Sequence, residues 1–260
     1  MLSLRRSTPP LNGYEFVTNF DQSEHPAYSE EEPNSLRPEE VPVFLAVLKD
    51  LYPQHFGMAY LGFATGLSPS SLRPLRRKGT SPDILWDQIQ SRLLVRQSQA
   101  VGTSVMNTTK QGVRYSIHLP AAVIDVLQWH VRTQLELPEQ QESDLLFPAI
   151  TGGFRSHKVL NDPFADVMAT IGINRRLTQR GMRRTFNDLA RAAGIERVVT
   201  RSVSGHLTEE MQHHYESIAP AEQRASIGKV IDLMEARTSR GGAPTGASSP
   251  GSGAPNRKAG

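Results

Sequence analysis

Three kinds of polar side chain occur near the C-terminus at spacings that suit chemistry on a phosphate. Arg180 and Arg183 are three residues apart in a segment with helical character, so their guanidinium groups share one face and could hold the same anion. His206 could donate a further hydrogen bond near pH 7. Tyr215 follows nine residues after His206, and its hydroxyl could form a covalent phosphotyrosine without metal or cofactor. The chemistry that these residues would support is transfer of a DNA strand.

Each of these groups also has an ordinary structural explanation. An arginine pair on a helix is most often a solvated face, and Gly205-His206 could be a simple turn. Tyr215 could be an amphipathic group at the end of a helix. Their order and separation together favour the catalytic interpretation.

In combination, these motifs resemble the catalytic domain of the tyrosine recombinases, also called phage integrases. That family has an H-x-x-R box on a helix, a Gly-His pair about twenty residues later and a tyrosine about nine residues beyond the histidine. Arg180-Gly181-Met182-Arg183 stands at the box, with Arg180 in place of the usual histidine, and Ser204-Gly205-His206 and Tyr215 stand at the later positions. Upstream, the resemblance continues through the segments 36–41, 64–67 and 109–110, and it spans about 36 to 234.

The resemblance implies a role for each residue. Tyr215 would attack the DNA phosphorus, while Arg180, Arg183 and His206 hold the nonbridging oxygens. Lys110, expected at the turn of a hairpin, would protonate the leaving 5′ oxygen. A 5′ hydroxyl of a second strand would reverse the step, so no cofactor is needed. The implied partners are double-stranded DNA and further copies of the chain, assembled as a homo-tetramer on DNA.

One position departs from the family in a way that bears on activity. The family's first box reads Gly-Leu-Arg, and its arginine binds the scissile phosphate, whereas this chain reads Gly66-Leu67-Ser68. Serine can donate one hydrogen bond but has neither a permanent charge nor a bidentate grip. Loss of one preorganised donor typically lowers the rate by ~10²–10³. We therefore expect strongly impaired activity.

A basic run follows this first box, and it predicts part of a DNA-binding surface. Arg73 and Arg76 are the residues that could reach back to the phosphate, although the proline between them disfavours a regular helix. The formal net charge is only +3, but the pI is about 9.3 and arginines cluster at 73–77, 175–184 and 191–201. Such clustering predicts a localised basic face. The predicted DNA contacts are Arg73, Arg76, Arg77, Lys78 and Arg184; the alternative is that these side chains only solvate helix surfaces.

Length and composition predict one globular domain, and the hydrophobic patterns along the chain predict mainly α structure with a small antiparallel β-sheet. Residues 1–35 are polar and are expected to form a disordered leader, residues 36–237 the catalytic domain, and residues 238–260 a disordered tail rich in Gly, Ala, Pro and Ser. Members of the family normally carry a core-binding domain of about ninety residues upstream, which adds phosphate contacts. Here only 35 residues precede the predicted domain, so we expect weak DNA affinity unless that part is supplied separately.

Hydrophobic periodicity locates the expected elements. Apolar residues at helical spacing follow Pro38, and further helices are predicted at about 54–64, 120–133, 157–171, 178–193, 196–203, 207–216 and 220–237. Short strands are predicted at 93–95, 105–106 and 115–119, the last two joined tightly through Gln111-Gly112 with Lys110 at the turn.

Several classes of protein are disfavoured by the composition. The chain has no cysteine, so disulfides and thiolate metal sites are absent and a cytoplasmic location is favoured. Its histidines lack metal-ligand spacing, and no apolar run approaches the ~20 residues that span a bilayer. Three functions remain open: a site-specific recombinase, an inactive relative that keeps DNA binding or subunit contacts, and a relaxing enzyme like the type IB topoisomerases. The short spacing from Gly205 to Tyr215 favours the first over the third.

Overall fold

The structure is a computed structural model that describes residues 34–86, 91–99, 105–109, 112, 114–205 and 220–235. The predicted leader, apart from residues 34 and 35, the predicted helix 207–216 and the predicted tail lie outside the described residues.

Helices α1 (Val41–Leu51) and α2 (Pro53–Thr65) form the first helical pair. The apolar stripe predicted for α1 is buried, but the helix begins at Val41 rather than at Pro38, since residues 38–40 form a turn. Helix α2 is buried from Phe56 to its end, so it has no solvated face over this length. It stops where the sequence predicts, because Gly66 takes the left-handed conformation that closes a helix.

Five further helices confirm the predicted pattern within a few residues. They are α4 (Ala121–Thr133), α6 (Asn161–Thr170), α7 (Gly181–Ala192), α8 (Arg197–Ser204) and α10 (Pro220–Glu235). Two short helices were not predicted, α3 (Pro69–Leu72) and α5 (Pro138–Glu142). Each is too short to repeat an apolar position often enough for a helical period to stand out.

The strands pair differently from the prediction. Strands β1 (Ile84–Leu85), β2 (Arg92–Val95) and β5 (Tyr115–His118) form an antiparallel sheet in the order β1-β2-β5. Strand β4 (Val105–Met106) pairs with β3 (Ser98–Gln99), so the predicted direct pairing of 105–106 with 115–119 is wrong.

The physical reason is the pattern of burial along the strands. In the pairing of β2 with β5, Leu93 lies opposite Ile117, and both side chains are buried on one face. Strand β4 offers no such alternation, because Val105 is half-buried and Met106 is exposed. Register is specified strongly only where one face of a strand is buried, which favours β2 as the partner of β5.

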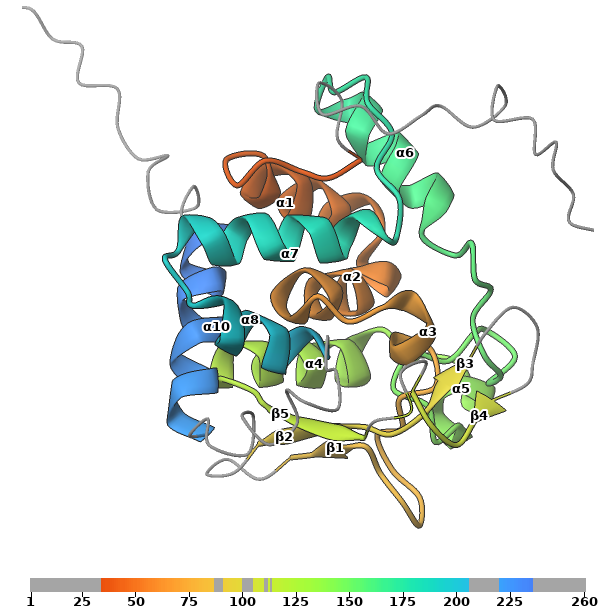
Figure 1. The fold of residues 1–260 in the computed structure, drawn as a ribbon. Coiled ribbons are helices and arrows are strands. Elements are labelled where there is room, and N and C mark those ends of the chain that lie inside the picture. The colour runs from red at the N-terminus through yellow and green to blue at the C-terminus, as the bar shows by residue number, and fades with distance from the viewer. Residues whose placement is uncertain are drawn as a thin grey trace, which may run out of the picture. The chain divides into compact units, whose positions relative to one another are not determined.

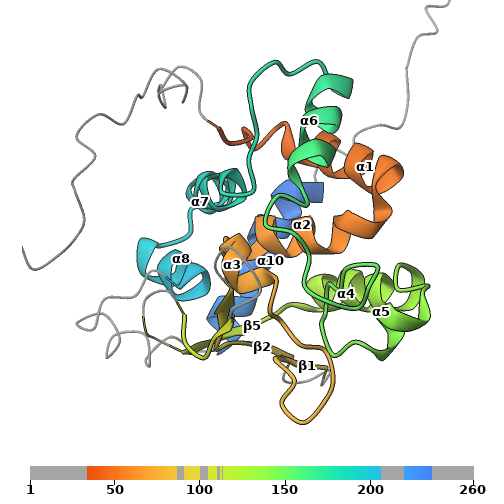
Figure 2. The same ribbon diagram turned by 90° about the vertical axis from the view of Figure 1, so that its right-hand side faces the viewer.

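Figures 1 and 2 show α2 inside the helical body, with α7 on one side and α4 on the other, and the sheet at the edge beyond α4. The core is continuous through these layers; an aromatic cluster of Phe44, Phe63 and Phe164 joins α1, α2 and α6. Trp129 packs edge-on against Phe56 and so belongs to the packing around α2 and α4. Among the described residues, no helix is both long enough and apolar enough to cross a membrane. The predicted fold class, mainly α with a small antiparallel sheet, is confirmed.

Candidate active site

Helix α7 is the element around which the candidate site is built. Met182, Phe186 and Leu189 form its buried stripe, which fixes the rotation of the helix against α2. Arg183 consequently lies at the border of the stripe and is half-buried, whereas Arg180 lies at the N-cap position and is exposed. The guanidinium of Arg180 has no hydrogen-bond partner within the described part of the chain.

Arg183 is held by the end of the next helix. Its Nη2 donates a hydrogen bond to the carbonyl oxygen of Ser204, at 2.8 Å. Its Nε is buried and has no partner among the described residues. Burial lowers the pKa of Arg183, with the neighbouring Tyr115 acting in the opposite direction, yet an arginine keeps its charge at physiological pH. Arg183 is therefore a fixed cation with a donor still unused.

Gly205, the first residue of the predicted Gly-His pair, makes a close approach to Tyr115. Gly205 ends α8 in the left-handed conformation, with φ +71°. A Cβ at this position would lie under 3.0 Å from Oη, Cζ and Cε1 of Tyr115. Only glycine satisfies both conditions, so the aromatic ring of Tyr115 rests directly on the backbone at Gly205. Burial raises the pKa of Tyr115, which keeps its hydroxyl protonated beside Arg183.

The first box also contacts α7. Gly66 has φ +65°, and a Cβ there would lie 2.5 Å from Cδ1 of Phe186. Phe186 is three residues after Arg183, so the backbone of the first box lies against the helix that carries the arginine pair. Three segments that are far apart in the sequence therefore converge on α7: the first box at Gly66, the end of α8 at Gly205, and β5 at Tyr115.

The sequence resemblance matches Ser68 to the family's first arginine, and in the structure the hydroxyl of Ser68 is engaged locally. Its Oγ lies 2.8 Å from the Oγ of Ser70 and 3.0 Å from the Oγ of Ser71, and it accepts a hydrogen bond from the backbone N–H of Ser71. The side chain caps the short helix α3. This corner of the chain therefore carries the hydroxyl groups of three serines.

Three of the predicted catalytic residues, Lys110, His206 and Tyr215, lie outside the described residues. Of the five predicted catalytic residues, the structure describes Arg180 and Arg183, both on the first turn of α7 or directly before it. In the described part of the chain, no three metal-binding side chains gather at one point.

Two residues of the basic run have contacts inside the protein. Arg73 is 4% exposed, and its guanidinium donates to the side-chain oxygen of Gln99 at 3.1 Å and also to the backbone carbonyl of Gln99. Arg77 donates to four backbone carbonyls at 2.9–3.0 Å, those of Gln140, Gln141, Ser143 and Leu145. These arginines join the first box to β3 and to the end of α5.

The other predicted DNA contacts remain nearer the surface. Lys78 is exposed, with its Nζ donating to the carbonyl of Gln141 at 2.6 Å. Arg184 is exposed and donates to the side-chain oxygen of Asn34 at 2.7 Å. Arg76 is half-buried and lines a surface pocket. A role in DNA binding is therefore easier to reconcile with Arg76, Lys78 and Arg184 than with Arg73 and Arg77.

Sequence reasoning missed two residues at the site, Tyr115 and Ser204. Ser204 acts through its backbone carbonyl, which every residue has, so its side-chain type carries no signal. Tyr115 is marked only by its place at the start of a predicted strand. Its contact with Gly205 spans ninety residues of sequence and follows from the fold.

Comparison with solved structures shows that the fold of the chain is similar to that of integrases. The Tn1549 transposon integrase in complex with transposon right-end DNA superposes with a TM-score of 0.55 at 18% sequence identity, over 85% of this chain and 70% of that one. The complex of the same integrase with circular-intermediate DNA superposes with a TM-score of 0.55 at 19% sequence identity, over 82% of this chain and 68% of that one. The integrase from mycobacterium phage Brujita superposes with a TM-score of 0.51 at 15% sequence identity, over 79% of this chain and 60% of that one.

The chain has the fold of these integrases. The prediction of a fold like that of the tyrosine recombinase catalytic domain is confirmed. Neither a protein-family model nor a curated protein matches the sequence. The likeness to integrases that these comparisons show is therefore a likeness of fold.

Proposed function

We propose that this protein is a DNA strand transferase of the tyrosine recombinase type, which breaks and rejoins double-stranded DNA through a 3′-phosphotyrosine at Tyr215. The observation that carries the proposal is the convergence on α7. Arg183 is fixed to the end of α8, and the chain continues from Gly205 directly into His206. The integrase fold and the DNA-bound state of the two Tn1549 integrase structures support the same substrate class.

The proposed reaction needs only side chains of the protein. The hydroxyl of Tyr215 loses its proton to solvent and attacks phosphorus, so that a Tyr–O–P bond forms and the bond to the 5′ oxygen breaks. Lys110 gives a proton to that oxygen. Arg180, Arg183 and His206 hold the nonbridging oxygens and stabilise the charge that develops on them. Attack by another 5′ hydroxyl then releases Tyr215, and it needs no cofactor because the phosphotyrosine conserves the energy of the broken bond.

The cationic clamp matters because a phenol is a weak nucleophile at neutral pH. An unperturbed tyrosine has a pKa near ~10, and nearby positive charge favours its phenolate. A half-buried arginine such as Arg183 supplies that charge in a medium where it is less screened than in water. Assembly as a homo-tetramer on DNA belongs to the same proposal.

A second candidate function is favoured by Ser68. Its hydroxyl is engaged with Ser70 and Ser71, so the corner that would carry the first arginine has no positive charge. A chain that keeps the fold and binds DNA, but does not cleave it, fits this observation. The two candidates predict different chemistry on the same scaffold.

The test is a denaturing gel for a covalent protein–DNA adduct. A pool of nicked duplexes with randomised sequence around the nick traps the adduct, because the short leaving strand diffuses away. We expect a weak adduct with the present chain, a stronger one with Ser68→Arg, and none with Tyr215→Phe. An adduct that persists in Tyr215→Phe would refute the nucleophile. If neither the present chain nor Ser68→Arg forms an adduct while both bind DNA, the non-cleaving candidate is correct.

A further inference from the structure

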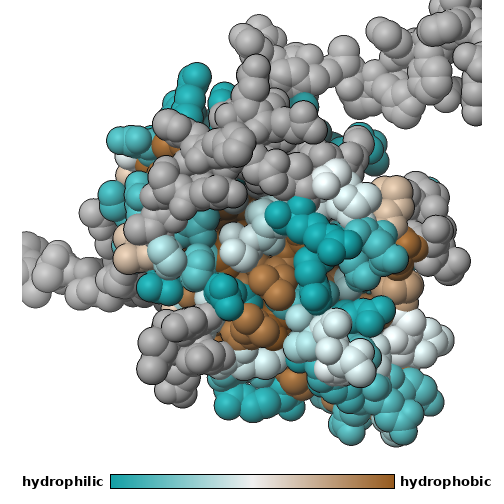
Figure 3. Space-filling model, turned by 60° about the horizontal axis from the view of Figure 1, so that its bottom comes forward, coloured by the Kyte–Doolittle hydropathy of each residue, from teal (hydrophilic) through white to brown (hydrophobic). Residues whose placement is uncertain are grey.

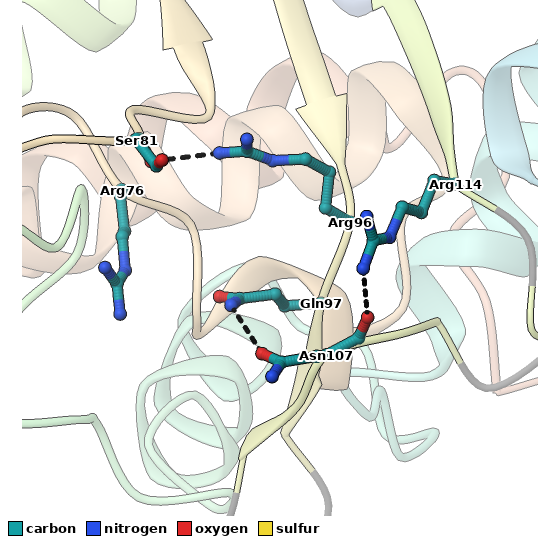
Figure 4. Close-up of a pocket in the computed structure, with 6 residues that line it drawn as sticks. All are labelled: Arg76, Ser81, Arg96, Gln97, Asn107 and Arg114. Atoms are coloured by element: carbon teal, nitrogen blue, oxygen red, sulfur yellow. Dashed lines mark hydrogen bonds between the residues drawn. The ribbon is translucent and has the colours of Figure 1, made fainter.

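A surface pocket of about 150 Å³ is lined by three arginines that come from separate segments of the chain. Arg76 follows α3, Arg96 directly follows β2, and Arg114 directly precedes β5. Ser81, Gln97 and Asn107 complete the lining, as Figure 4 shows. None of these six residues is acidic, and every one has a side chain that can donate a hydrogen bond.

Much of the donor capacity of the arginines is unused by the described residues. Arg114 donates through one Nη2 to the backbone carbonyl of Asn107, at 2.9 Å. Arg96 uses Nε towards Asp83 and Nη2 towards the carbonyls of Ser81 and Pro82. The guanidinium of Arg76 has no hydrogen-bond partner in the described part of the chain. A guanidinium has five N–H donors, so each arginine keeps donors for a ligand.

The positive charge of the pocket is only partly compensated. Asp83 forms an ion pair with Arg96 at 2.7 Å, and its other oxygen accepts the backbone N–H of Arg76. It is the one carboxylate within the described residues that bonds to a residue of the lining. Among the described residues, three guanidinium groups with one hydrogen-bonded carboxylate leave an excess of two positive charges. Like charges held close together raise the free energy of the empty pocket, and a bound anion relieves that cost.

The pocket also has the right size and place for one backbone phosphate. A single water needs only ~10–15 Å³ of a pocket whose volume is about 150 Å³, so a tetrahedral oxyanion has room. Arg114 is bonded to Tyr115, the residue that rests on Gly205 beside Arg183, so the pocket is linked to the candidate active site through one peptide. Figure 3, which brings the sheet side forward, shows hydrophilic residues around much of this face.

We propose that Arg76, Arg96 and Arg114 form a second phosphate-binding site, which takes a phosphodiester of the DNA backbone away from the one that reacts. The proposal rests on the proposed function, because it takes DNA as the ligand. Contacts to phosphate fix the register of a protein on the duplex without reading its sequence. The site would therefore orient the duplex with respect to Arg183, and it would do so for any sequence.

The test compares two double variants in the Tyr215→Phe background, where no adduct can form. Arg76→Gln/Arg114→Gln removes two of the pocket arginines and spares Arg96, whose ion pair supports the fold. Arg132→Gln/Arg191→Gln removes the same charge from exposed positions on α4 and α7. Binding of a fluorescent duplex is followed by anisotropy between 0.05 and about 0.3 M KCl, because each neutralised phosphate contributes ~0.9 to the slope of log K against log salt.

We expect the pocket variant to lower that slope by about 0.9 for every duplex tested, so that its loss of affinity relative to the parent is about fivefold larger at 0.05 M than at 0.3 M KCl. The control variant should leave the slope unchanged. Equal slopes in the two variants would overturn the phosphate site and leave the proposed function standing. No binding of DNA by the Tyr215→Phe parent would overturn both. Thermal unfolding of each variant checks the fold. The single variant Arg114→Lys keeps the charge and should therefore keep most of the salt dependence of the parent.

Discussion

The contact between Gly205 and Tyr115 gives the sharpest test of the site's architecture. Substitution of Gly205 by alanine has two separable costs. The residue has φ +71°, and an alanine in that conformation is destabilised by ~1 kcal/mol. The new Cβ would also lie under 3.0 Å from three atoms of the Tyr115 ring, and overpacking of this kind costs ~1–3 kcal/mol. The expected loss in the free energy of unfolding is therefore ~2–4 kcal/mol.

A matched control separates the two costs. Gly172 has φ +73°, and a Cβ built there meets nothing within 4 Å. Gly172→Ala should therefore show the conformational cost alone, ~1 kcal/mol. In the double variant Gly205→Ala/Tyr115→Leu the three clashing ring atoms are gone, so the two substitutions should couple favourably by at least ~1 kcal/mol.

Urea unfolding followed by circular dichroism measures the parent, the three single variants Gly205→Ala, Gly172→Ala and Tyr115→Leu, and the double variant. Equal losses for Gly205→Ala and Gly172→Ala, or strict additivity in the double variant, would show that the ring does not rest on Gly205. The effect should also extend to function. A shift of the end of α8 by ~1 Å would move the anchor of Arg183 and lower adduct formation by ~10²-fold. This second readout is made in the Ser68→Arg background, where the adduct is expected to be stronger.

Three further predictions concern single contacts. Arg77→Ala should lower the free energy of unfolding by about 2–3 kcal/mol, because four carbonyls lose a charged donor, whereas Lys78→Ala, which removes one exposed contact, should change it by less than ~1 kcal/mol; urea titration of both variants measures the difference. His130 is 0% exposed, and burial, with a smaller contribution from Arg155, lowers its pKa to about 3. His130 therefore takes up a proton near pH 6.5 in the unfolded chain but stays neutral at that pH in the folded chain. The free energy of unfolding consequently falls as the pH drops below 6.5, by about 2 kcal/mol between pH 7.5 and 5. His130→Gln should remove that part of the pH dependence, and an unchanged dependence would contradict the assignment. Arg183→Lys in the Ser68→Arg background keeps a charge but loses the planar fork, so adduct formation should fall by ~10²–10³ with little change in the melting temperature; an unchanged rate would mean that Arg183 is not part of the clamp.

Much of the fold could be predicted from the sequence, because its long helices have strong periodic patterns. The buried stripe of α1, the end of α2 at Gly66 and the placement of α7 all follow from local spacing of apolar residues and from one glycine. The short elements could not be found in this way. Strands of two residues contain less than one full alternation, so the partner of β4 was decided by burial across the sheet.

For the site, the sequence determined the residue types and therefore the possible chemistry. The order of Arg183, Gly205 and Tyr215 indicates phosphoryl transfer, and Ser68 indicates a missing charge. Residue types and their spacing along the chain can be read directly from the sequence.

Only the tertiary structure decided which of these residues are held together and by what. The anchoring of Arg183 by the carbonyl of Ser204 and the seat of Tyr115 on Gly205 join segments twenty-one and ninety residues apart. The contacts of Arg73 and Arg77 also depend on the tertiary structure. Their charge suggested a surface role, but their guanidinium groups donate to backbone carbonyls of the protein. A carbonyl is identical in every residue, and its position depends on how helices pack, so contacts of this kind have no signature in the sequence.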